Sequence, residues 1–351
     1  MENKKKLGLE ILFLVAVFAA TMYGVFHGEN INEIIEIIKR VQKIYLLPAV
    51  ICVLLFVWGE SIIIRYMMGT LNIRVRKWTC FLFSSVGFFF SCITPSASGG
   101  QPAQILYMRR ENIPIPISTL VLMIVTITYK AVLVIAGIAI LIFGQGFIHD
   151  YLDGIVPVFY LGIFLNVACV SFMLIMVYNT TFAGNILNSG LSFLEKTRVV
   201  RYKERRHKRL EAGIKKYGET AVYFKNHYHV VIHVLLITFA QRFALFLSTY
   251  FVYKSFGLES FSALTIVILQ AVISISVDML PLPGGMGITE KLFLTIFAPV
   301  FGTTLLLPGM VLCRGLSYYT QLFMCAVLTV LAHFTIGRKG SVVEENQKEK
   351  L

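Results

Sequence analysis

Runs of about twenty apolar residues recur along the chain, and they constrain its fold more than any other feature. Each run is long enough to cross a hydrocarbon core roughly 30 Å thick. The runs cover about 7–26, 44–69, 116–143, 155–178, 230–253 and 305–335. The composition is 57% hydrophobic and 15% charged, whereas soluble domains are roughly 45–50% apolar and about 25% charged. We therefore predict an all-α polytopic membrane protein in which residues 1–351 form a single integral membrane domain, and we exclude a soluble enzyme, a disordered chain and a coiled coil.

The formal net charge of +13 is concentrated in one place, because ten of the 32 Lys and Arg residues fall within 196–216. Basic loops of membrane proteins stay in the cytoplasm and bind anionic headgroups. The partner predicted for 196–216 is therefore the anionic membrane surface, and we expect this chain alone to bind no nucleic acid. The same rule makes 179–229 a basic cytoplasmic loop and places both termini in the cytoplasm. Residues 29–43 carry isoleucines at helical spacing opposite charges, which predicts an amphipathic helix on the outer surface.

Two further apolar stretches are broken by proline and glycine. Residues 79–110 break at TPSASGGQP between basic flanks, and the second arm of about ten residues rises only about 15 Å as a helix, which predicts a re-entrant hairpin. Residues 260–300 break at LPLPGGMG and form a second broken hairpin. Its arms are longer, so this segment could either re-enter on one side or cross the membrane twice. Paired interrupted segments in two halves indicate a transporter's central site. With about six full spans, the two Pro/Gly-broken hairpins suggest an inverted repeat.

Charged side chains inside spans are a second sign of function. Each costs roughly 2.5–3.5 kcal/mol at the centre of the membrane, so each marks either a substrate pathway or a buried ion pair. Those set in from a span end or beside a break are Glu60, Lys130, Arg242, Asp278, Glu290, Lys291 and Arg314. Four cations against three anions predict a mildly positive cavity that suits an anionic headgroup. The helices that resume after Gly100 and Gly287 would also point their positive ends inward and attract anions, although these glycines could serve only to shape the hairpins.

Other chemistry finds little support in the sequence. The six cysteines lie in apolar segments without a Cys-x-x-Cys pair, so we assign them to packing. His227, His229 and His233 have no carboxylate nearby, which argues against a metal site. Ser96 and Ser98 lack a local His or Asp partner, and no ATP-binding GxxxxGK[ST] motif is present. We therefore predict no catalytic residue, no metal and no cofactor.

The motif TPSASGGQPAQILYMRR, followed far downstream by LPLPGGMGITE, resembles the lysylphosphatidylglycerol synthase transmembrane family over nearly the whole chain. The resemblance implies that full-length relatives have two parts. A membrane half acts as a lipid flippase, and a C-terminal soluble domain transfers lysine from lysyl-tRNA to phosphatidylglycerol. This chain stops at Leu351, so we expect the flippase half without the synthase domain. The functional positions implied by the motifs are Thr94, Pro95, Gly99, Gly100, Pro102, Arg109, Pro283, Gly284, Gly285, Gly287 and Glu290.

The resemblance leads us to expect a flippase or transporter of the bacterial inner membrane that moves a phosphatidylglycerol- or lysyl-phosphatidylglycerol-type lipid and is linked to resistance to cationic antimicrobial peptides. Arg109, Arg242 or Arg314 would hold the phosphate. A lysyl group or a coupling proton would be bound by one of the carboxylates, namely Glu60, Asp278 or Glu290. The open alternatives are a phosphatidylglycerol lysyltransferase-type enzyme acting alone or with a separate soluble synthase, a polyprenyl-phosphate or glycolipid carrier, and an envelope scaffold. A homo-oligomer also stays open.

Overall fold

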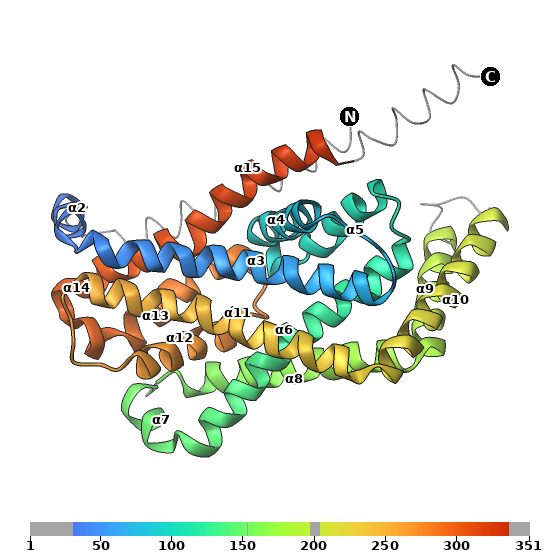
Figure 1. Ribbon diagram of the computed structural model, residues 1–351. Helices are drawn as coiled ribbons and strands as arrows, with labels where there is room; N and C mark the ends of the chain where they lie inside the picture. The colour runs from blue at the N-terminus through green and yellow to red at the C-terminus, as the bar shows by residue number, and fades with distance from the viewer. Residues whose placement is uncertain (1–30, 153, 197–203, 337–351) are drawn as a thin grey trace.

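The computed structural model describes residues 31–152, 154–196 and 204–336 (Figure 1). Within these ranges the regular structure is entirely helical. Five long helices are apolar enough to cross a membrane by length and composition. They are α3 (Leu46–Thr70), α6 (Ile115–Phe143), α8 (Val156–Tyr178), α11 (Tyr228–Ser255) and the last helix, formed by α14 (Ala298–Arg314), a π-helical turn (Gly315–Tyr319) and α15 (Thr320–Thr335). The predicted all-α membrane fold is confirmed, and the predicted spans after the first coincide with these helices; the span at 7–26 lies outside the described residues.

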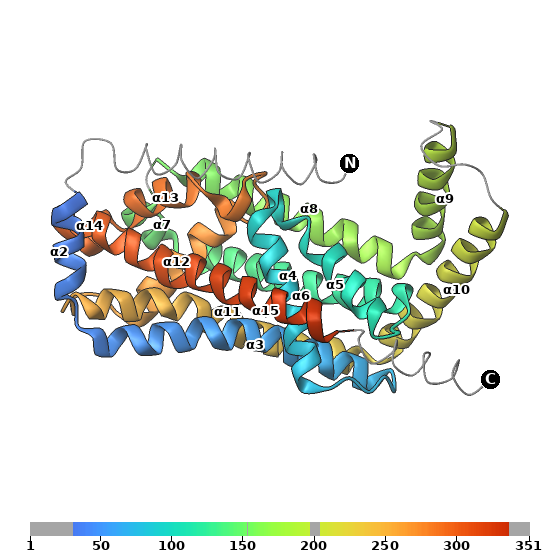
Figure 2. The ribbon, with the colours of Figure 1, turned by 90° about the horizontal axis from the view of Figure 1, so that it is seen from above.

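Shorter helices complete the fold. They are α2 (Ile31–Arg40), α4 (Lys77–Ile93), α5 (Gly100–Arg110), α7 (Gln145–Tyr151), α9 (Thr180–Lys196), α10 (Glu204–Asn226), α12 (Ala263–Val277) and α13 (Ile288–Ile296). In both views α2 and α14 lie at one end of the bundle and α9 and α10 at the other, while α3 and α11 pack side by side between the ends (Figures 1 and 2). The turn between α3 and α4 lies at the α9–α10 end, because the Tyr223 hydroxyl of α10 donates to the Thr70 carbonyl at 2.9 Å. We call this end, which carries Arg74, Arg76 and Lys77, the basic end.

The segment predicted as a basic loop at 179–229 is mostly helical, because it forms α9 and α10. Tyr217 and Phe224 of α10 are buried in the same apolar cluster as residues of α6. The opposite face of α10 carries charge, with an exposed ion pair of 2.7 Å between Lys208 and Glu204 one helical turn apart. An apolar stripe at helical spacing beneath a charged face stabilises a helix even in a strongly basic sequence.

The first hairpin consists of α4, a 3-10 turn at Pro95–Ala97 and α5, which packs back against α4. Both its outer ends lie toward the basic end of the bundle (Figure 1). Gly100 starts the returning helix, and a methyl group there would lie 2.7 Å from the carbonyl oxygen of Gly87. Glycine is needed here because the backbone of α5 approaches that of α4 so closely.

The second hairpin consists of α12, a break that includes a 3-10 turn at Pro283–Gly285, and α13. Ser262 caps α12 near the α2 end, where its hydroxyl accepts from the Thr265 amide at 3.1 Å. Gly284, Gly285 and Gly287 have positive φ angles of 56°, 65° and 85°, which glycine adopts without strain. These angles let α13 turn back toward the end from which α12 came (Figure 2).

The tips of the two hairpins meet inside the bundle, because their 3-10 turns contact each other. One large apolar cluster surrounds α12, α13 and α14, and another joins α3, α4, α6 and α10 at the basic end. The Tyr318 hydroxyl, in the π-helical turn, donates to the Cys92 carbonyl at 3.0 Å and so ties the last helix to the end of α4. The broken segments therefore bring polar backbone to the region between two apolar cores.

Candidate functional site

Two adjoining cavities lie where the hairpin tips meet. The Arg242 cavity, of about 240 Å³, is lined by Arg242 and Arg314 together with polar side chains of α11 and α12. The Glu60 cavity, of about 460 Å³, is lined by Glu60 and Lys130 together with polar side chains of α5. Residues that line both include Tyr129, Asp278, Gly284 and Tyr318. The two cavities therefore form one polar region at the centre of the bundle.

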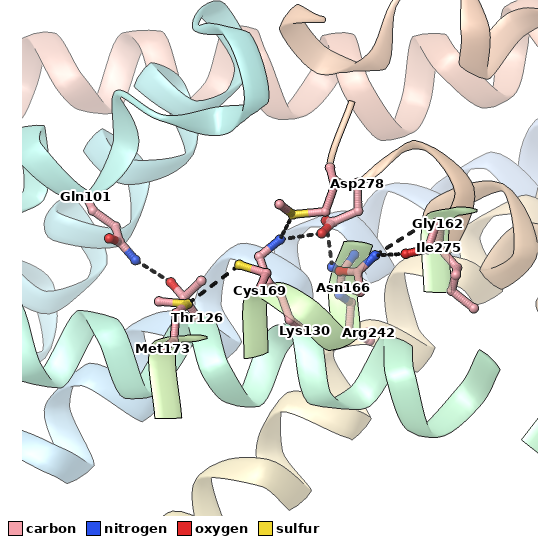
Figure 3. A network of polar contacts seen from close by, with 11 residues as sticks. Gln101, Thr126, Lys130, Gly162, Asn166, Cys169, Met173, Arg242, Ile275 and Asp278 are labelled. Atoms are coloured by element: carbon pink, nitrogen blue, oxygen red, sulfur yellow. Dashed lines mark hydrogen bonds and ion pairs between the residues drawn. The ribbon is translucent and has the colours of Figure 1, made fainter. Parts of the chain in front are cut away.

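Asp278, at the end of α12, is the charged centre of this region (Figure 3). Its Oδ2 lies 2.5 Å from Lys130 Nζ of α6, and its Oδ1 lies 3.7 Å from Arg242 Nη2 of α11. The exposed fractions of the three side chains are 12% for Lys130, 15% for Asp278 and 4% for Arg242. The carboxylate between two cations lowers the cost of burying all three groups and leaves one positive charge in excess.

The guanidinium of Arg242 has N–H donors without a hydrogen-bond partner among the described residues. It lies over the Tyr129 ring, 3.2 Å from the ring centroid. Its contact with Asp278 is longer than a hydrogen bond, and within the described part of the chain its Nε and Nη2 have no hydrogen-bond partner. A buried guanidinium with unpartnered N–H groups is costly, and Arg242 also lines the cavity, so a small local shift would let an acceptor in the cavity reach these groups. This arrangement suits a phosphate or carboxylate oxygen.

In the other cavity the carboxylate of Glu60 has no cationic partner among the described residues. Gln104 of α5 donates from Nε2 to Glu60 Oε1 at 2.6 Å. Gly87 of α4 makes room for this amide, because any side chain at that position would overlap Gln104. In the ranges that the structure describes, no Lys, Arg or His forms an ion pair with Glu60. Glu60 therefore presents a carboxylate that can receive a cationic group or a proton.

Gln101 adds a second amide from α5, and its Nε2 donates to the Thr126 hydroxyl and to the Leu122 carbonyl (Figure 3). Gln101 and Gln104 lie about one helical turn apart at the start of α5, directly after the break of the first hairpin. The hairpin thus turns two neutral polar side chains toward the cavity, while its prolines and glycines shape the backbone behind them.

The carboxylate of Glu290 already has hydrogen-bond partners within the protein. Its Oε1 accepts from Arg314 Nε at 2.7 Å, and its Oε2 accepts from the Gly287 amide at 2.7 Å. Arg314 also donates from Nη2 to the Gly284 carbonyl at 3.1 Å. The positive start of α13, expected to attract a substrate anion, is therefore already capped by a carboxylate of its own first turn. At the start of α5 the Gly99 amide likewise donates to the Thr94 hydroxyl at 2.9 Å.

The structure brings some of the predicted site residues to the cavities and leaves others outside. Those that line a cavity are Glu60, Lys130, Arg242, Asp278, Gly284, Gly285 and Arg314. Those that line neither cavity are Thr94, Pro95, Gly99, Gly100, Pro102, Arg109, Pro283, Gly287 and Glu290. Arg109 is exposed at the end of α5, and Lys291 is exposed on α13. The described walls therefore carry three cations, Lys130, Arg242 and Arg314, and two carboxylates.

Several lining residues were not predicted from the sequence. Gln101 and Gln104 lie three residues apart directly after the glycine pair of the first motif, and this polar spacing in a short apolar helix was a usable signal. Tyr129, Tyr318 and Gln321 had no such signal, because aromatic and amide side chains are common on helices that only pack. They are recognised as site residues only from the cavities that they line.

Comparison with known proteins identifies the family of this chain. The family model described as "Lysylphosphatidylglycerol synthase TM region" matches residues 9–325. This match covers most of the chain, including both broken hairpins and all the residues that line the two cavities. No curated protein matches the chain.

Proposed function

Because this chain belongs to the lysylphosphatidylglycerol synthase TM family, we propose that it is a flippase or transporter that moves an anionic or aminoacylated phospholipid across the membrane. The observation that carries the proposal is the buried Arg242, which lines a cavity at the meeting point of two broken hairpins and whose Nε and Nη2 have no hydrogen-bond partner among the described residues. Midplane sites built from discontinuous helices are typical of transporters.

The phosphate is assigned to the Arg242 cavity. Its oxygens would accept from Nε and Nη2 of Arg242, which lack acceptors within the part of the chain that the structure describes. Asp278 lies too far from Arg242 for a hydrogen bond and keeps its shorter contact with Lys130. A phosphate can therefore bind Arg242 without displacing the Lys130–Asp278 pair. Charge-assisted bonds to a guanidinium are among the stronger polar contacts available to it.

The cationic part of a headgroup is assigned to Glu60. This carboxylate lies in the adjoining cavity and, among the described residues, has only Gln104 as a hydrogen-bond partner. A lysyl-phosphatidylglycerol headgroup carries a phosphate and ammonium groups, so it would place opposite charges against Arg242 and Glu60. A coupling proton on Glu60 is the other role that this geometry allows.

Movement of the lipid would use the irregular backbone of the last helix. Gly302 has a φ of 66°, Pro308 interrupts α14, and the π-helical turn follows Arg314. Breaks of this kind are the usual places where a membrane helix bends. Tyr318 in this turn lines both cavities and is hydrogen-bonded to the end of α4, the first arm of the first hairpin. Rocking of one half against the other would expose the cavities to alternate sides.

The setting proposed for this activity is the bacterial inner membrane, with both termini and the basic end in the cytoplasm. The helices α9 and α10 and the basic segment 196–216 would bind the anionic surface there. Exposure of a cationic lipid on the outer leaflet would reduce the binding of cationic antimicrobial peptides.

The test is lipid movement in proteoliposomes of the purified chain. Fluorescent phosphatidylglycerol and lysyl-phosphatidylglycerol would be compared by dithionite quenching, in the parent, in Arg242→Gln and in the matched control Arg109→Gln. We expect faster quenching in the parent and a loss of about tenfold or more in Arg242→Gln, since hydrogen bonds to charged groups contribute about 1.5–3 kcal/mol. The exposed Arg109→Gln variant should keep the parent rate.

Two outcomes would contradict the proposal. Parent protein that accelerates neither lipid would exclude transport of both, and equal losses in the two arginine variants would exclude a specific role for Arg242. Mass spectrometry of lipids from expressing cells tests the transferase alternative, which predicts new lipid species. A polyprenyl-phosphate carrier would instead accelerate quenching of a labelled polyprenyl phosphate in the same vesicles.

A further inference from the structure

A groove separate from the two cavities lies on the outside of α3, next to the start of α4. Its volume is about 560 Å³, and it shares no lining residue with either cavity. The residues that line it are Trp58, Ser61, Ile62, Arg65, Tyr66, Gly69, Thr70 and Lys77. Trp58, Arg65 and Gly69 lie on the exposed face of α3, whereas Glu60 points to the central cavity.

The charge of this groove has one sign. Arg65 and Lys77 are both exposed on it, and no described residue that lines it is acidic. Within the described ranges neither Arg65 nor Lys77 forms an ion pair. The Tyr66 hydroxyl is held at the wall by a hydrogen bond of 3.1 Å to His233 Nδ1 of α11. Two unpaired cations above a concave surface complement an anion.

Apolar side chains continue from the groove along the exposed face of α3. They are Leu47, Ile51, Leu54, Leu55, Trp58 and Ile62. Trp58 lies seven residues before Arg65, which is a helical rise of about 10 Å away from the basic end. A soluble anion would gain nothing from this apolar stripe, whereas the acyl chains of a phospholipid would lie against it. The groove therefore matches a ligand with an anionic head and an apolar tail.

We propose that this groove is a binding site for an anionic phospholipid of the leaflet at the basic end. Its phosphate contacts Arg65 and Lys77, and its acyl chains follow α3 past Trp58. Basic pockets beside transmembrane helices are suited to such headgroups. The site is distinct from the proposed transport pathway, because it shares no lining residue with the two central cavities.

Gly69 offers a way to block the groove without removing its charge. A methyl group at this position would meet nothing within 4 Å. Gly69 lies one turn after Arg65 on the same helix face, so its missing side chain leaves the groove open. A leucine there should fill part of the space that the headgroup occupies, while the helix itself tolerates leucine better than glycine.

The experiment uses the intrinsic fluorescence of Trp58. The chain contains 2 tryptophans, so Trp78→Phe leaves Trp58 as the only one. The full-length variant would be placed in vesicles that contain either acyl-brominated phosphatidylglycerol or acyl-brominated phosphatidylcholine at the same mole fraction. We expect stronger quenching by the anionic lipid, with its relative affinity reduced about fivefold by Arg65→Gln and again by Lys77→Gln, as the contribution of one basic residue near an anionic surface implies. Gly69→Leu should reduce the same preference.

The matched control is Arg109→Gln with Arg110→Gln, which removes two exposed basic residues from the same end of the bundle and should leave the preference unchanged. Equal quenching by the two lipids in the parent would overturn the proposal. A preference that falls equally in the control and in the Arg65→Gln, Lys77→Gln variant would assign it to general surface charge and also overturn it. Because the experiment measures lipid binding, its result tests this proposal independently of the proposed lipid transport.

Discussion

The buried pair between Lys130 and Asp278 should be strongly coupled, and a double-mutant cycle can measure this. Their charged atoms lie 2.5 Å apart, with exposed fractions of 12% and 15%. Removing one member of a buried pair costs about 3–5 kcal/mol when the remaining charge has no other partner. After Lys130→Met, however, Asp278 still has Arg242 at 3.7 Å, so we expect a smaller loss of about 1–2 kcal/mol, scaled down from that range.

Asp278→Asn should be the more damaging change, because it leaves both Lys130 and Arg242 without a counter-charge. We expect it to lower the free energy of unfolding by about 3–5 kcal/mol. In the double variant one of the two uncompensated cations is gone. The combined loss should therefore be smaller than the sum of the single losses by about 2 kcal/mol, within the range measured for close charge pairs.

The measurement is the free energy of unfolding in micelles, followed by circular dichroism through a denaturant titration. A matched cycle on Lys254 and Glu259 provides the control, since the charged atoms of this pair are similarly close, at 2.7 Å, but its carboxylate is 82% exposed. Water screens that pair, so its coupling should be much weaker. Additivity within about 0.5 kcal/mol for Lys130 and Asp278, or coupling no larger than in the control cycle, would refute the reasoning.

Three further perturbations test the packing around the site. Gly162→Ala should destabilise the protein by about 1–3 kcal/mol, because a methyl group on α8 would overlap the backbone at Ile275 of α12. Gly284→Ala should cost at least about 1–2 kcal/mol for its left-handed backbone alone, and more because the new methyl would lie 2.6 Å from the Tyr318 hydroxyl; both losses can be measured by unfolding in micelles. Among the six cysteines, Cys169 should react first with a small charged thiol reagent in the folded protein, as followed by mass spectrometry, because it lines the Glu60 cavity and is not fully buried.

Gly69→Ala is the control for both glycine variants, since it is helical and its methyl would meet nothing within 4 Å; it should leave stability unchanged or slightly raised. A loss at Gly69 as large as at Gly162 or Gly284 would show that close packing is not the cause. For the thiols, faster modification of the buried Cys313 or Cys325 would contradict the cavity described here.

The spans and the breaks follow from local sequence. Each long apolar run had to become a helix, because a backbone in lipid must satisfy its own hydrogen bonds. The breaks at Pro95 and Pro283 are equally local, since proline and glycine interrupt helices wherever they cluster. The helices α9 and α10 could also have been predicted from their apolar stripe. The segment was described only as a basic cytoplasmic loop, because that prediction rested on its charge.

The roles of the charged residues were decided by tertiary structure. Lys130 and Asp278 are 148 positions apart, and nothing in either segment indicates that they pair. Both Glu290 and Arg242 were predicted to bind a ligand. Glu290, however, caps the start of α13 and bonds to Arg314, whereas Arg242 lines a cavity and has unpartnered donors within the described residues. The sequence by itself determined which segments are helical and where they break, because those choices depend on neighbouring residues. Which charges neutralise each other depends on how the helices pack, and packing joins residues that the sequence leaves far apart.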